Sequence, residues 1–79
     1  MDAFERRRQV VQHFRGGVSI LYYDPGYANY VNLCAAGYRV RFFLNEVERF
    51  DVTVADSEAG TTTISGIERK GNVAIRLDK

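Results

Sequence analysis

The sequence predicts an α+β protein in which an N-terminal amphipathic helix packs on a curved, mainly antiparallel sheet of five or six short strands, barrel-like in form. Three observations lead to this fold class. Apolar residues recur at helical spacing near the N-terminus, later segments alternate apolar and polar residues, and short turn sequences separate these segments. Because 79 residues are enough for only one domain, we expect a single domain over residues 1–79.

The first element is predicted to be a helix over about residues 2–15. Asp2 and Glu5 have the spacing of a capping box, in which the two residues satisfy free backbone N–H groups at the helix start. Gly16 and Gly17 can adopt the positive φ that often ends a helix. The apolar side chains that should cover the sheet form one helical stripe: Phe4, Val11 and Phe14.

The clearest strand pattern is the alternation in residues 38–44, around which we expect the other strands to assemble. Successive side chains of a strand point to opposite faces, so one face enters the core and the other stays in solvent. Phe43 places an aromatic ring on the outer face, where it either packs under the helix or a loop, or belongs to a binding surface. The predicted core face holds Tyr38, Val40, Phe42 and Leu44, and the outer face holds Arg39, Arg41 and Phe43.

Alternation and β-branched residues predict four further strands. Phe50, Val52 and Val54 are expected to point into the core. Gly66 is expected to form a bulge or corner at which a strand resets its facing. Residues 68–72 are expected to form the last turn. The four strands cover about residues 18–23, 49–55, 61–67 and 72–78.

Residues 27–36 fit two structures. The alanines Ala35 and Ala36, followed by Gly37 as a stop, favour a helix. The turn sequence at residues 24–26 and the tyrosines that follow favour a hairpin. We expect a strand over about residues 28–34, with the helix as the alternative.

Composition limits the function classes. The formal net charge of +1 points to neither nucleic acid nor an anionic membrane. Cys34 is the single cysteine, which excludes an intramolecular disulfide and a multi-cysteine metal site. The chain shows no signal-peptide pattern and no apolar run near the ~20 residues of a membrane span. We therefore expect a cytoplasmic protein without a membrane partner.

The residues show no constellation for catalysis, a metal or a cofactor. His13 is the only histidine, and a nucleophilic pair with Cys34 would need a third orienting group and an oxyanion site. Asp56 and Glu58 lie in a predicted loop without a known ligand spacing. We expect the protein not to be an enzyme and to bind no cofactor or metal.

Two binding functions remain. We expect a small non-enzymatic interaction module that self-associates or binds another protein, because a small sheet with free edges and many aromatic residues suits that role. The alternative is binding of RNA or single-stranded nucleic acid through the basic helix and the outer face of residues 38–44. The candidate contact residues are Arg7, Arg8, Arg39, Arg41, Phe43, Arg69 and Lys70.

Overall fold

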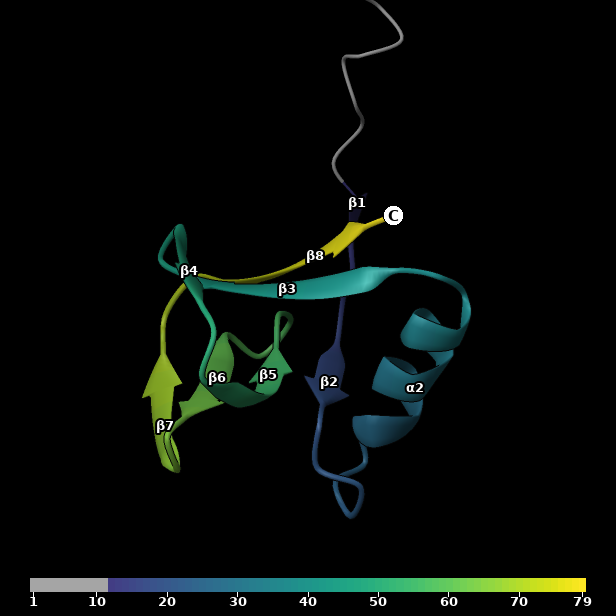
Figure 1. Ribbon diagram of the computed structural model, residues 1–79. Coiled ribbons are helices and arrows are strands. Elements are labelled where there is room, and N and C mark those ends of the chain that lie inside the picture. The colour runs from purple at the N-terminus through teal and green to yellow at the C-terminus, as the bar shows by residue number, and fades with distance from the viewer. Residues whose placement is uncertain (1–11) are drawn as a thin grey trace, which may run out of the picture.

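The computed structural model describes residues 12–79, which form two four-stranded antiparallel sheets and one helix (Figure 1). The fold is α+β and mainly antiparallel, as predicted, but the two sheets do not close into a barrel-like form, and the strands outnumber the five or six expected. Sheet A has the order β1 (Gln12–His13), β8 (Val73–Asp78), β3 (Arg39–Leu44) and β4 (Val47–Arg49). Sheet B has the order β2 (Gly17–Ser19), β5 (Val52–Asp56), β6 (Thr61–Ile64) and β7 (Ile67–Lys70), and the helix is α2 (Tyr27–Ala35).

The predicted N-terminal helix is wrong at its C-terminal end, and residues 2–11 lie outside the described part of the chain. Gln12 and His13 form β1 and pair with Leu77 and Arg76 of β8. The backbone N–H of Phe14 then donates to the carbonyl of residue 75 over 2.8 Å. Helical spacing of apolar residues is a weak signal over so few residues. Here the backbone hydrogen bonds to β8 outweigh the local preference for a helix.

Ser57 directs the chain from sheet A to sheet B after β1. The backbone N–H of Gly16 donates to Ser57 Oγ, and the N–H of Ser57 donates to the Gly16 carbonyl, both over 3.0 Å. Ser57 Oγ also donates to the carbonyl of Phe14. The strand predicted over residues 18–23 is shorter than expected, because β2 ends at Ser19 and a turn follows.

The predicted strands over 38–44 and 72–78 are confirmed as β3 and β8, which pair along their whole length. Val40, Phe42 and Leu44 pack against the buried core, in agreement with the predicted facing. The strand that follows β3 in the chain is β4, joined to it by a two-residue turn in which Asn45 and Glu46 have positive φ. Two consecutive positive φ values are typical of a type I′ hairpin turn.

The predicted strand over 49–55 is in fact two strands in different sheets. β4 ends at Arg49 in sheet A, and β5 begins at Val52 in sheet B. The chain changes sheet at Phe50 and Asp51, so Phe50 is 87% exposed and its predicted core position is wrong. Val52 is buried as predicted.

The predicted strand over 61–67 is likewise divided, because Ser65 and Gly66 form a hairpin turn with positive φ at both residues. The predicted bulge or corner at Gly66 is therefore wrong. Arg69 and Lys70, expected in a turn, belong to β7, which pairs with β6. β7 is the last strand of sheet B.

The choice of a strand for residues 28–34 is also wrong, and the helical alternative is right. The helix α2 ends in a Schellman motif: the N–H of Tyr38 donates to the Leu33 carbonyl, and the N–H of Gly37 donates to the Cys34 carbonyl. Gly37 has φ +93°, which a residue with a side chain adopts only with strain.

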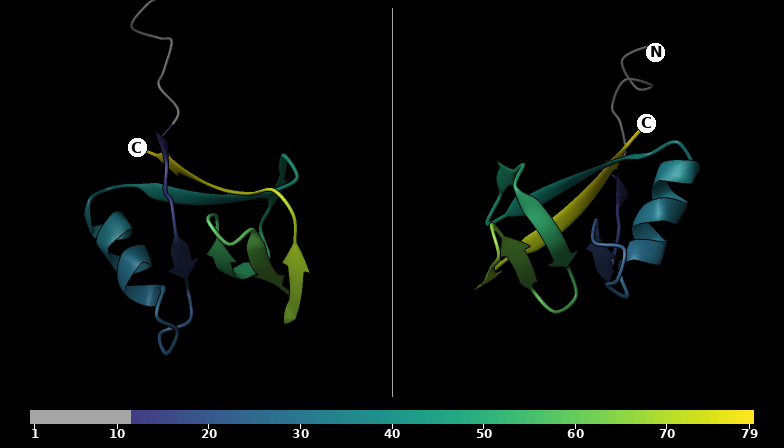
Figure 2. Two further views of the ribbon diagram at one scale, coloured as in Figure 1. Left: turned by 180° about the vertical axis from the view of Figure 1, so that it is seen from behind. Right: turned by 60° about the horizontal axis from the view of Figure 1, so that its bottom comes forward.

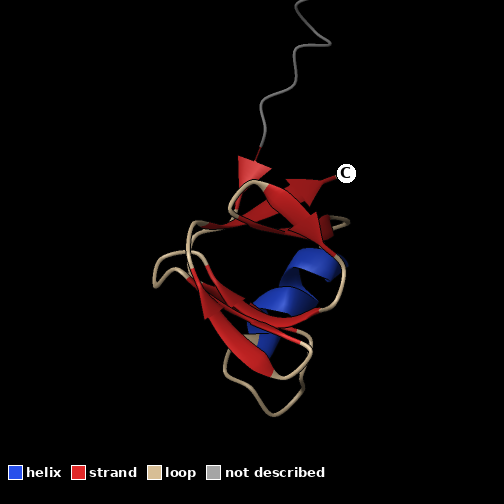
Figure 3. Ribbon diagram, turned by 90° about the vertical axis from the view of Figure 1, so that its left-hand side faces the viewer, coloured by secondary structure: helices blue, strands red, loops and turns tan. Residues whose placement is uncertain are grey.

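The core lies between the two sheets, which Figure 3 shows as separate layers. Its buried side chains come from both sheets, and α2 adds partly buried side chains at one end. In Figures 1 and 2, α2 and β7 lie on opposite sides of the molecule. The buried residues are Val18, Val52, Ala55, Ile64, Val73 and Ile75, and Phe14, Tyr30, Leu33, Val40, Phe42 and Leu44 pack against them.

Candidate interaction surfaces

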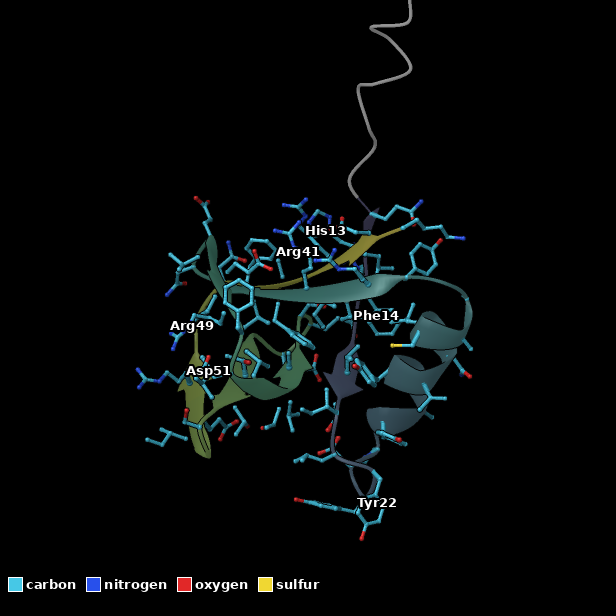
Figure 4. All side chains as sticks on the ribbon, in the orientation of Figure 1. His13, Phe14, Tyr22, Arg41, Arg49 and Asp51 are labelled. Carbon is cyan, nitrogen blue, oxygen red and sulfur yellow. The ribbon has the colours of Figure 1, made fainter. Side chains whose placement is uncertain are left out.

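The outer side of sheet A carries the predicted outer residues of β3. Because Val40 and Phe42 pack on the core, their neighbours Arg39, Arg41 and Phe43 point away from it, and Figure 4 shows Arg41 on this side of the sheet. Neighbouring strands add further charged side chains through their register with β3. We name this surface the arginine face; it consists of Arg39, Arg41, Phe43, Glu48, Arg76 and Asp78.

Arg41 is held by two carboxylates of the arginine face. Its Nε donates to Glu48 Oε2 over 2.9 Å and its Nη2 donates to Glu48 Oε1 over 2.6 Å, which makes the pair bidentate. Its Nη1 donates to Asp78 Oδ2 over 2.8 Å. The guanidinium of Arg41 therefore ties β3 to β4 and β8, and a phosphate group would have to displace a carboxylate to bind it.

The same contacts shift the ionisation of these groups. Hydrogen bonds from Arg41 lower the pKa of Glu48 and of Asp78 below their ordinary values, and nearby arginines act in the same direction. The pKa of Arg41 is raised, chiefly by its hydrogen bonds to Glu48. The network is therefore ionised at neutral pH.

Phe43 is half-buried, and guanidinium groups cover it. The central carbon of the Arg41 guanidinium lies 5.5 Å from the ring centroid, and that of Arg76 lies 5.2 Å away. Arg76 reaches Asp78 only at 3.9 Å, and its buried Nε has no hydrogen-bond acceptor among the described residues. The ring thus stabilises two cations on its own sheet face.

The seven predicted contact residues do not form one surface. Arg39, Arg41 and Phe43 lie together on sheet A, whereas Arg69 and Lys70 lie on β7 of sheet B. Arg7 and Arg8 lie outside the described residues. Whether any of these side chains binds a partner stays a prediction.

Two hollows flank β8, and His13 lines both of them. The larger has a volume of about 500 Å³ and also contacts Phe14 and Ser57; the smaller, of about 240 Å³, contacts Phe43 and Arg76. Cys34 lines neither hollow and is exposed on α2. Within residues 12–79, no group of three or more His, Cys, Asp or Glu side chains is placed to hold a metal ion. The helix in this part of the chain lacks the length and hydrophobicity needed to cross a membrane.

A second surface, which the residue patterns did not suggest, lies on α2 and the loop before it. Tyr22 is 80% exposed and Tyr23 is 73% exposed, and their rings meet edge to face at 5.4 Å. Ile20 and Val31 are also exposed. We give the name neutral face to a set of exposed uncharged residues of this loop and helix: Ile20, Tyr22, Tyr23, Ala28, Val31, Cys34 and Ala35.

The neutral face has a signal in the sequence. Charged residues make up 27% of the chain, yet Asp24 is the only one in residues 16–38. Charge depletion together with exposed tyrosine is the composition typical of the centre of a protein–protein interface. Tyr22 lies at the end of the molecule away from the arginine face (Figure 4).

Hydrogen bonds fix the loop that presents the two tyrosines. Asp24 Oδ1 accepts from the N–H of Gly26 over 2.9 Å, and Ser19 Oγ accepts from the N–H of Leu21 over 3.0 Å. The N–H of Ser19 donates to the Gly26 carbonyl, which ties the loop to β2. A loop ordered in this way loses little conformational freedom when it binds.

No family model, curated protein or solved structure shows significant similarity to this chain.

Proposed function

We propose that the protein is a non-enzymatic interaction module that self-associates through the neutral face. The observation that carries this proposal is the exposure of Tyr22 and Tyr23 on an ordered loop that contains a single charge. Tyrosine is enriched among the residues that dominate binding energy, because its ring buries a large area and its hydroxyl can form a hydrogen bond. In water, removing the apolar area of such rings from solvent is favourable, and on this exposed loop that requires contact with another molecule.

A second copy of the chain is the partner that fits the charges. In a symmetric dimer both copies contribute the same surface, so charges of one sign repel each other where they lie near the two-fold axis. The neutral face contains none, and Asp24 beside it is the only nearby carboxylate in residues 16–38. The arginine face, in contrast, carries three arginines against two carboxylates.

Analytical ultracentrifugation of the full chain tests this proposal. The mass should rise from the monomer value of 9.0 kDa towards that of a dimer as the concentration increases. Tyr22→Ser combined with Tyr23→Ser should weaken the dimer at least about tenfold. Phe50→Ser is the matched control, because it removes an equally exposed aromatic ring outside the neutral face. A monomer at every concentration, or equal weakening by the control, would contradict the proposal.

Binding of RNA or single-stranded DNA is a second candidate function. It is favoured by the two guanidinium groups beside Phe43 and by the exposed Arg39 on the same face. It is weakened by Glu48 and Asp78, which hold Arg41. Binding of a generic oligonucleotide that falls steeply with salt and is reduced by Arg39→Ala would support it.

We also propose that the protein is cytoplasmic, because its single cysteine allows no intramolecular disulfide.

A further inference from the structure

We propose that β7 is an acceptor edge for an extended strand from a different protein, at a site separate from the neutral face. β7 is the outermost strand of sheet B, and all four of its residues are exposed. Among residues 12–79, no strand pairs with its outer side. Figure 3, viewed from the β7 side of Figure 1, shows this edge uncovered by the helix. An open edge presents backbone N–H and C=O groups that a further strand can pair with.

The hairpin register identifies which backbone groups are free. Ile64 and Ile67 flank a two-residue turn and therefore exchange hydrogen bonds with each other. Along a strand, the backbone N–H and C=O groups of successive residues point to alternate sides. The N–H and C=O groups of Ile67 and Arg69 therefore point to β6. The N–H of Gly71, two residues further on, donates to the Gly60 carbonyl and continues the same alternation. Glu68 and Lys70 therefore direct their N–H and C=O groups towards the open edge.

The side chains of β7 divide between the two faces of sheet B. Ile67 and Arg69 pair with Ile64 and Thr62, which are buried, so they lie on the core side. Ile67 nevertheless remains 58% exposed, because no further strand of residues 12–79 lies beside it. Glu68 and Lys70 lie on the outer side, and an added strand would complete both faces.

The charges of β7 make a second copy a poorer match than a complementary strand. Symmetric antiparallel pairing centred on Glu68, Arg69 or Lys70 places two identical charges directly opposite each other, and this repulsion remains even in the Arg69 register, which sets Glu68 opposite Lys70. Charged edge strands commonly protect a protein from pairing with itself. The same charges select a partner strand of complementary pattern.

The complementary strand has a definite sequence pattern. An antiparallel partner meets Lys70 first and Ile67 last. Read from its N-terminus, it carries acidic residues opposite Lys70 and Arg69, a basic residue opposite Glu68 and an apolar residue opposite Ile67. A peptide containing Glu-Glu-Lys-Val has this pattern, and a peptide containing Lys-Lys-Glu-Val is its charge-reversed control.

Fluorescence anisotropy with the two labelled peptides tests the charge selection on the full chain. The complementary peptide should bind at least about tenfold more tightly than the reversed one. Arg69→Glu combined with Lys70→Glu should invert this preference. Equal binding of both peptides, binding of neither, or a preference that the double variant leaves unchanged would overturn the proposal.

A backbone variant tests the pairing itself. Glu68→Pro removes the outward N–H but none of the bonds to β6, whereas Glu68→Ala removes only the side chain. The proline variant should bind the complementary peptide at least about fivefold less tightly than the alanine variant. Equal affinities would overturn strand addition. Loss of Tyr22 and Tyr23 should leave peptide binding unchanged, which separates this site from the proposed self-association.

Discussion

Gly26→Ala should destabilise the protein, because Gly26 is packed against the backbone of β2. A Cβ atom at this position would lie 3.1 Å from backbone atoms of Gly17, Val18 and Ser19. Val18 and Ser19 are fully buried and cannot move aside easily. Gly26 has φ −74°, which alanine adopts without strain, so the cost is entirely steric.

The magnitude follows from two opposing effects. Overpacking of a buried site costs about 1–3 kcal/mol. Replacing glycine by alanine at a compatible φ stabilises by about 0.4–1 kcal/mol through the unfolded state. Taken at their midpoints, these effects give a net destabilisation of about 1 kcal/mol, or a fall of about 4–8 °C in Tm for a chain of this size.

Gly17→Ala is the matched control, because its Cβ would meet its nearest atom, Asp56 Oδ2, at an ordinary 3.6 Å. Urea and thermal unfolding followed by circular dichroism should rank Gly26→Ala below the wild type and Gly17→Ala at or above it. The close packing of the tyrosine loop on β2 would be refuted if the two variants were equally stable.

Three further predictions concern the core, the helix end and the arginine face. Ile75→Ala should lower the free energy of unfolding by about 2–5 kcal/mol in urea titrations, because Ile75 is fully buried between the sheets. Gly37→Ala should cost about 1–2 kcal/mol, all of it from φ +93°, since a Cβ there would meet no atom within 4 Å. The pKa values of Glu48 and Asp78 are lowered in the folded state, so their contribution to stability is present at neutral pH and is lost on acidification below about pH 5, as the unfolded chain takes up protons first. Arg41→Gln should flatten this acid dependence in unfolding curves measured across pH, and an unchanged profile would contradict the network.

The parts of the fold that alternation predicts correctly are β3 and β8, whose pattern is uninterrupted. Alternation could not show that the chain changes sheet at Phe50, because the apolar pattern continues through residues that belong to two layers. The helix α2 was ambiguous because its tyrosines suit a strand, whereas the Schellman motif at Gly37 depends on backbone geometry.

The candidate surfaces were predictable to a different extent. The shared face of Arg39, Arg41 and Phe43 follows from their spacing alone. The partners of Arg41 do not, since Glu48 and Asp78 reach it only through the register of β3 with its two neighbours. The neutral face is visible in the sequence as the stretch from residue 16 to residue 38 with a single charged residue, Asp24, but scarcity of charge alone does not distinguish a buried segment from an exposed one.

The reactivity of Cys34 can show whether the neutral face is the surface of the proposed self-association. This thiol is the only one in the chain, and it is exposed on α2 within the neutral face. Its alkylation rate, measured at increasing protein concentration, should fall in step with the rise in mass. The Tyr22→Ser and Tyr23→Ser double variant should keep the fast rate throughout. A rate that stays constant while the mass doubles would place the interface outside the neutral face.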